Sequence, residues 1–248
     1  MTTLAHVEPA APRGLPRART RERWFALAMT MALCGLVLRG FWPSYFGPLL
    51  TGRGTARPFV MHLHGVVFSG WMVLLVVQVF LVARRRVALH RTLGLVSVGY
   101  AVLLTGLGLW VSFSAPVAHV RAGEWSVDQA ASFLLLPLID MVLFAGFFTA
   151  AVVYRRQPDY HKRLMFAATL AIVFAAVGRI FDSSLAGFLT VWLSPLAGAM
   201  IFDRLTRGHV HRVYVVTFAV FVAAFCRILL METPLWMAVG RTLLGPFL

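Results

Sequence analysis

The stretch that decides the fold is FVMHLHGVVFSGWMVLLVVQVFLVARRRVALHRTLG, residues 59–94. Residues 59–83 contain no Asp, Glu, Lys or Arg. At about 1.5 Å per residue, a helix of this length crosses the roughly 30 Å hydrocarbon core of a bilayer. Three consecutive arginines follow at 84–86, and a second apolar run begins at residue 92. This order predicts a hairpin of two transmembrane helices that turns at a membrane surface.

The same pattern returns along the chain, at VYRRQPDYHKRLM (153–165) and, more loosely, at FDRLTRGHVHRVYV (202–215). Only 13% of the residues are charged, whereas a soluble domain carries roughly 25%. We therefore predict an all-α, polytopic membrane helix bundle with seven transmembrane helices. Six are possible, because only the short FDSSL turn separates the fifth run from the sixth. The predicted spans are 23–43, 59–83, 92–113, 130–154, 162–181, 184–202 and 212–231.

The net charge of +14 is distributed unevenly. Sixteen of the 23 Lys and Arg residues fall in the amino-terminal tail and in every second turn. Cytoplasmic segments of membrane proteins collect Lys and Arg, so the bias predicts a cytoplasmic N-terminus and an outer C-terminus in a bacterial inner membrane. It also accounts for the basic composition without nucleic acid. We expect the inner turns to bind anionic lipid head groups, through Arg84, Arg85, Arg86, Arg155 and Arg156.

Three regions follow from this reading. Residues 1–22, rich in Arg, Pro and Ala, are expected to form a disordered basic cytoplasmic tail. Residues 23–231 form the transmembrane bundle. Residues 232–248 are expected to lie along the outer face as an interfacial segment.

Ionisable residues inside the spans are the strongest functional signal, because burial in a bilayer makes each one costly. Asp140 lies near the midplane of the fourth predicted span. Its carboxyl group must either pair with an arginine or stay neutral and donate a hydrogen bond. The candidate partners lie nearer the outer ends of other spans: Arg39, Arg179 and Arg227.

The second span carries His62 and His64 near its outer end, and His64 shares one helix face with Trp71 and Gln78. His64 is a candidate ligand of haem iron or a metal ion, a partner for a quinone carbonyl, or a side chain bonded to a buried neighbour. Gly65 and Gly70 would let a helix or a flat ligand approach closely. The outer halves of five helices would then enclose a polar pocket.

Three further histidines, His90, His161 and His211, begin predicted helices at the inner face. They are candidates for binding lipid phosphate or for ligating a metal or haem.

The sequence lacks the motifs of several other kinds of membrane protein. The only lysine is Lys162, which excludes a rhodopsin-type retinal linkage. GxxxxGK[ST], HExxH and CxxCH are absent, so the sequence predicts no nucleotide site and no separate metal site.

HLHG with a downstream Gln, LHRTLG and HKRLMFAATLAIVFAAVGR resemble an uncharacterised family of bacterial multi-pass membrane proteins, over residues 59–230. That family is loosely similar to cytochrome b561-like proteins, in which helix histidines hold haem b. The resemblance implies His64, His90 and His161 as cofactor-binding residues.

Two classes of function are therefore expected, with a third behind them. The first is a redox membrane protein linked to haem b or quinone. The second is a non-enzymatic carrier or binding protein whose outer pocket takes an anionic or amphiphilic small molecule. The third is an accessory subunit that binds partner chains in the membrane. No catalytic residue follows from the sequence.

Overall fold

The computed structural model describes residues 16–52, 57–181 and 184–248, and every regular element within these ranges is a helix. Seven of the helical segments are long and apolar enough to cross a membrane, so the prediction of a seven-helix integral membrane protein is confirmed. The elements are α1 (Pro16–Phe41), η1 (Trp42–Phe46), α2 (Gly47–Thr51), α3 (Phe59–Ala83), α4 (Val87–Arg121), α5 (Val127–Val153), η2 (Tyr154–Arg156), α6 (Pro158–Ile180), α7 (Leu185–Arg207), α8 (Arg212–Phe225), η3 (Cys226–Leu229), α9 (Pro234–Leu244) and η4 (Gly245–Phe247).

The first helix is longer than the sequence predicts. It begins at Pro16, inside the expected tail, and continues through the π-helical turn η1 into α2. Glu22 explains part of this extension, because its carboxylate accepts hydrogen bonds from Arg207 and Lys162 and thereby fixes the early turns of α1. Residues 1–15 of the expected tail lie outside the described residues.

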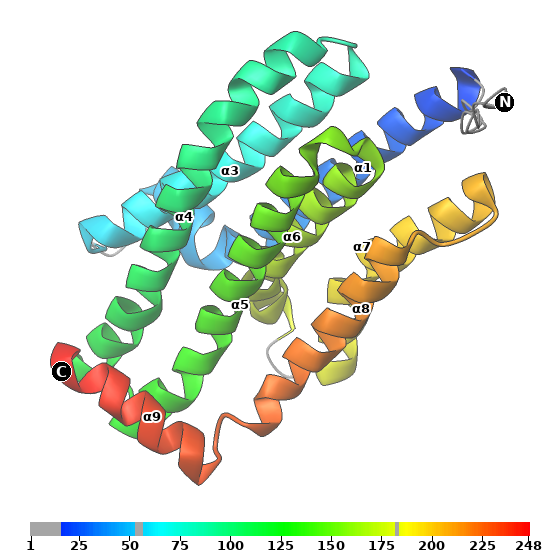
Figure 1. Ribbon diagram of the computed structural model, residues 1–248. Coiled ribbons are helices and arrows are strands. Elements are labelled where there is room, and N and C mark those ends of the chain that lie inside the picture. Colours follow the sequence, from blue (N-terminus) through cyan, green and yellow to red (C-terminus); the bar gives the residue numbers. More distant parts are fainter. Residues whose placement is uncertain (1–15, 53–56, 182–183) are drawn as a thin grey trace, which may run out of the picture.

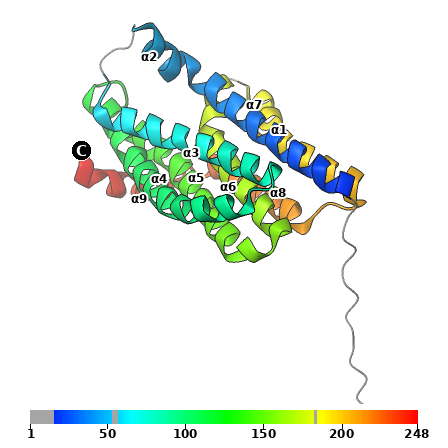
Figure 2. The same cartoon turned by 90° about the horizontal axis from the view of Figure 1, so that it is seen from above.

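Helices α3, α4, α5 and α6 form an up-and-down bundle, with α1 packed against α3 and α6 (Figures 1 and 2). Helices α7 and α8 pack against the other side of α6, which is the most buried of the seven spans. Its small residues allow this central position because alanine lets neighbouring backbones approach closely. The fully buried alanines of α6 are Ala167, Ala168, Ala171 and Ala176.

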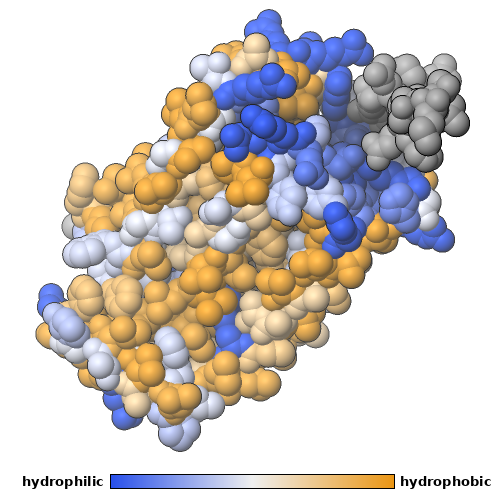
Figure 3. Space-filling view, in the orientation of Figure 1, coloured by the Kyte–Doolittle hydropathy of each residue, from blue (hydrophilic) through white to orange (hydrophobic). Residues whose placement is uncertain are grey.

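Trp71 of α3 fills the centre of the four-helix bundle. Its indole N–H donates to Thr169 Oγ1 of α6 at 3.3 Å, and its ring meets the rings of Phe144 and Phe148 of α5 edge-on. The helix face that carries His64, Trp71 and Gln78 was expected to point into the bundle, and at Trp71 it does. Outside the core, a broad apolar surface covers the middle of the molecule, as a lipid-facing surface must (Figure 3).

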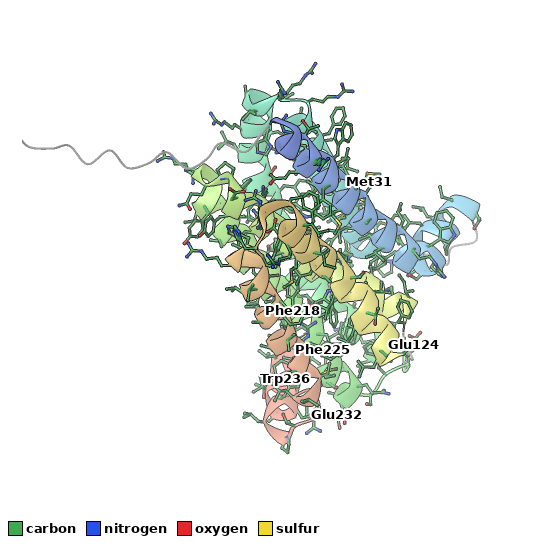
Figure 4. The ribbon with its side chains drawn as sticks, turned by 90° about the vertical axis from the view of Figure 1, so that its right-hand side faces the viewer. Met31, Glu124, Phe218, Phe225, Glu232 and Trp236 are labelled. Carbon is green, nitrogen blue, oxygen red and sulfur yellow. The ribbon has the colours of Figure 1, made fainter. Side chains whose placement is uncertain are left out.

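The two ends of the bundle differ. The α3–α4 and α5–α6 turns and the start of α1 lie at one end, with the hydrophilic surface of Figure 3. We call this the inner end. At the opposite, outer end, α9 crosses the bundle (Figure 1). Trp236 of α9 donates to the Ala131 carbonyl of α5 at 2.9 Å, and α8 leads down to this helix through η3 (Figure 4).

Candidate functional site

The inner histidines His90 and His161 lie together. Helices α4 and α6 both begin at the inner end, and each histidine is the fourth residue of its helix. The two rings therefore lie at the same level of the bundle. Their centres are 6.2 Å apart, and their planes cross at 78°.

In each histidine ring, Nδ1 forms a hydrogen bond with a group on a neighbouring helix. His161 Nδ1 lies 2.8 Å from the Ala151 carbonyl oxygen of α5. A carbonyl only accepts, so Nδ1 carries the proton and Nε2 keeps its lone pair. The side-chain amide of Gln78 on α3 satisfies its neighbours in one orientation. In that orientation its nitrogen donates to His90 Nδ1 at 2.6 Å, and its oxygen accepts from Gly94 N and Ser97 Oγ.

One group from each of the four bundle helices thus meets at the inner end. These are Gln78 of α3, His90 of α4, the Ala151 carbonyl of α5 and His161 of α6. Among the described residues, no group of three or more His, Cys, Asp or Glu side chains is arranged to hold a metal ion. The site therefore offers two imidazoles, which is the donor set of a six-coordinate haem.

The midplane carboxylate has a partner from a different element. Arg227, in η3, donates to Asp140 Oδ1 at 2.6 Å, and both side chains are almost fully buried. The guanidinium also lies 4.3 Å from the centre of the Phe174 ring on α6, while its Nε has no partner. This contact ties the end of α8 to α5 and α6.

Arg179 and His64 lie on a different side of α6. Phe174 and Arg179 are five residues apart, which turns them by about 140° around the helix axis. Arg179 stacks over Phe41 of α1 at 4.6 Å, and its charge acts on His64 of α3. Helix α6 therefore divides the expected outer pocket, so Asp140 and Arg227 do not share a site with Arg179 and His64.

The rest of the expected pocket is occupied or exposed. His62 Nδ1 is 3.4 Å from the hydroxyl of Tyr45, and the Tyr45 ring covers Gly65. The hydroxyl of Tyr100 covers Gly70 in the same way. Of the two alternatives for these glycines, the structure therefore shows the close approach of neighbouring helices, through Tyr45 of η1 and Tyr100 of α4. Arg39 is exposed on α1.

A hollow of about 510 Å³ does open at the outer end, between the start of α5 and the segment that leads into α9. Asp128, Phe133 and Met237 are among the residues that line it, and no residue of the predicted pocket does.

A buried ion pair at the inner end escaped the sequence analysis. Arg163 is 1% exposed and forms a two-pronged contact with Asp203 of α7, which also accepts the backbone N–H of His211. Asp159 and Glu22 extend this network to Arg207 and Lys162. The available signal was the presence of acidic residues in turns that are otherwise basic. By contrast, Arg84, Arg85, Arg86, Arg155 and Arg156 are exposed.

No protein-family model, curated protein or solved structure matches this chain.

Proposed function

We propose that this integral membrane protein is a redox protein in which His90 and His161 would hold haem b at the inner end. One observation carries the proposal: two imidazoles from different helices lie at one level, with ring centres 6.2 Å apart. A metal held by two imidazoles, at roughly 2 Å from each nitrogen, separates the ring centres by about 6 Å.

The surrounding groups suit ligation. A histidine that binds a metal usually donates its second ring N–H to a carbonyl or carboxylate, which fixes the tautomer and the ring orientation. The Ala151 carbonyl accepts from His161 in this way. For His90 Nε2 to bind the metal, the Gln78 amide would make a half-turn, so that its oxygen, instead of its N–H, faces a protonated His90 Nδ1.

When bound, haem b supplies reversible one-electron transfer. The chain's own contribution is to hold the two imidazoles at one level. Trp71, seven residues before Gln78 on α3, is fully buried in the bundle core. His64 is not a ligand in this proposal, because it lies towards the outer end, far along α3 from Gln78.

The same proposal includes the cellular setting. A bacterial inner membrane, with the basic inner end in the cytoplasm, agrees with the exposure of the arginines at 84–86. We expect anionic lipids to bind there, and partner chains in the membrane to exchange electrons with the haem.

The visible absorption spectrum of detergent-purified protein from haem-supplemented cells tests the proposal. We expect a Soret band that shifts on reduction with dithionite. His90→Ala and His161→Ala should each abolish this low-spin spectrum at normal yield. His64→Ala should retain it, as should His119→Ala, which removes an exposed histidine paired with Glu124.

A colourless wild-type protein would contradict the proposal. That result would favour the alternative of a non-enzymatic carrier or an accessory subunit. A spectrum that depends on His64 and not on His161 would move the cofactor to the outer half.

A further inference from the structure

We propose that the outer end of the junction of α1, α3 and α6 binds an oxyanion between Arg179 and His64, carried as the head group of an amphiphile. The site is independent of the inner histidines, so its test does not depend on haem.

The unpaired nitrogen of His64 is the first observation. His64 Nδ1 is shielded from solvent and has no hydrogen-bond partner, while the ring stacks on Phe68 with centres 4.0 Å apart. More than nine in ten buried polar groups of native proteins have a partner, so an unpaired one requires an explanation. A neutral imidazole with Nδ1–H would donate this bond to an anion.

The second observation is that Arg179 has no acidic partner among the described residues. Its guanidinium lies against the Phe41 ring, and one N–H donates to the Ala175 carbonyl oxygen at 3.1 Å. Within residues 16–52, 57–181 and 184–248, no carboxylate lies within ion-pair distance of this arginine. The buried arginines Arg163 and Arg227 both pair with aspartates, whereas Arg179 is exposed on α6. Arg179 therefore retains a net positive charge and free donors, and its charge acts on the His64 imidazole.

Helix α1 packs against both α6, which carries Arg179, and α3, which carries His64. Gly40 of α1 lies against the backbone of Ala176 on α6, and four residues after Phe41 the Tyr45 ring lies on Gly65 of α3. The π-helical turn η1 sets this second contact. Turns of this type occur frequently at functional sites.

The neighbouring surface indicates an amphiphile as the source of the anion. Leu63 and Val66 flank His64 in the sequence and are 38% and 65% exposed, on a helix whose outer surface faces lipid. An apolar tail can lie against these side chains while the oxyanion accepts hydrogen bonds from Arg179 and His64. Guanidinium is suited to this role because its fork of N–H groups matches the oxygens of phosphate and carboxylate.

Three probes distinguish the sources of the anion: phosphatidylglycerol, inorganic phosphate and the zwitterionic phosphatidylcholine. Each is titrated into the full-length protein in a neutral detergent, with bound molecules counted by native mass spectrometry. We expect saturable binding of phosphatidylglycerol and weaker or no binding of the other two. If inorganic phosphate binds as well, the site accepts the oxyanion from either source.

Variants then locate the site. Arg179→Gln should weaken phosphatidylglycerol binding at least about tenfold, as expected from the loss of a charge-assisted hydrogen bond. His64→Phe should weaken it less, because it removes one neutral donor. Arg179→Lys, which keeps the charge, should give an intermediate affinity and provides a second variant if Arg179→Gln fails to fold. Arg39→Gln, an exposed arginine at the same end of α1, is the matched control and should bind like the wild type.

The proposal is overturned if phosphatidylglycerol binds no better than phosphatidylcholine. It is also overturned if Arg39→Gln weakens binding as much as Arg179→Gln, since that result would indicate general surface attraction.

Discussion

At the scale of single residues, the buried Asp140–Arg227 contact has the largest energetic consequence. Removing one partner of a buried ion pair leaves an uncompensated charge in an apolar environment and costs about 3–5 kcal/mol, whereas removing both is often nearly neutral. Both side chains here are at least nine-tenths buried. The ion pair therefore holds the end of α8 against α5.

We predict that Asp140→Asn lowers the free energy of unfolding by about 3–5 kcal/mol. Asp140→Asn combined with Arg227→Gln should recover much of the loss, because no unpaired charge remains. Thermal unfolding in detergent measures both variants. Asp128→Asn is the matched control, since it breaks the exposed pair with Arg241 and should change little. A double variant as unstable as the single one would mean that the pair is not the source of the stability.

The sequence indicated at this scale that Asp140 needs either an arginine or a proton, because the cost of burying a charge is independent of the fold. It did not select Arg227 over Arg179, which also lies near the outer end of a predicted span. That choice depends on which face of α6 each arginine meets, and only packing determines it. The sequence also named His90 and His161 as candidate cofactor-binding residues without showing that they lie side by side, since 71 positions separate them along the chain.

At the scale of helices, close packing of α1 on α6 depends on a single missing side chain. A Cβ at Gly40 would lie 2.2 Å from the Ala176 carbonyl oxygen, whereas one at Gly35 would meet nothing within 4 Å. Helix α1 continues through Arg39 and Gly40 without a break. The glycine is the contact point between two helices.

Gly40→Ala should accordingly destabilise the protein by about 1–3 kcal/mol, because overpacking forces the backbones apart. Thermal unfolding detects the change. Gly35→Ala, in the same helix, should be neutral or slightly stabilising, since alanine is the better helix former. Equal effects of the two substitutions would show that helix propensity, and not the α1–α6 contact, determines the outcome.

The start of α8 has a cap that depends on pH. His211 Nδ1 accepts a hydrogen bond from the Val213 backbone N–H at 3.2 Å, so the imidazole must be unprotonated there. Burial, followed by the charge of Arg163, lowers the pKa of His211 below its ordinary value of 6.5. Arg207 acts in the same direction, and Asp159 and Asp203 oppose it.

A lowered pKa means that the unfolded chain binds the proton more readily than the folded protein. The stability due to the cap is therefore fully present above pH 6.5 and is lost as the pH falls towards the folded-state pKa. We expect the melting temperature to fall between pH 7.5 and pH 5.5, and His211→Asn to reduce that fall, because asparagine caps without titrating. The same pH dependence in wild type and variant would assign it to other groups.

At the scale of the whole molecule, the basic turns and the start of α1 lie at one end, and the C-terminus lies at the other (Figure 1). Seven spans place the two ends of the chain on opposite sides of the membrane. The charge bias then predicts which side is cytoplasmic.

Reporter fusions test this orientation. A periplasmic phosphatase fused after Leu248 should be active, and a cytoplasmic fluorophore at the same position should stay dark. Fusions at Gly208, in the α7–α8 turn, should give the opposite pattern. Fluorescence at Leu248 would require an even number of spans or an inverted protein.

The sequence by itself determined that this chain is a multi-pass membrane protein, with seven spans preferred over six, and where its basic turns lie. Hydrophobic length and charge act locally, through the transfer of each segment from water to lipid, and need no knowledge of neighbours. Tertiary structure alone decided the sites. It placed His90 beside His161, paired Asp140 with Arg227 and buried Arg163 against Asp203. It also left His64 Nδ1 without a partner and put Arg179 over the Phe41 ring of α1. These pairings depend on how helices rotate and approach one another, and inside a bilayer that is determined by small residues and side-chain fit rather than by the hydrophobicity that identifies a span.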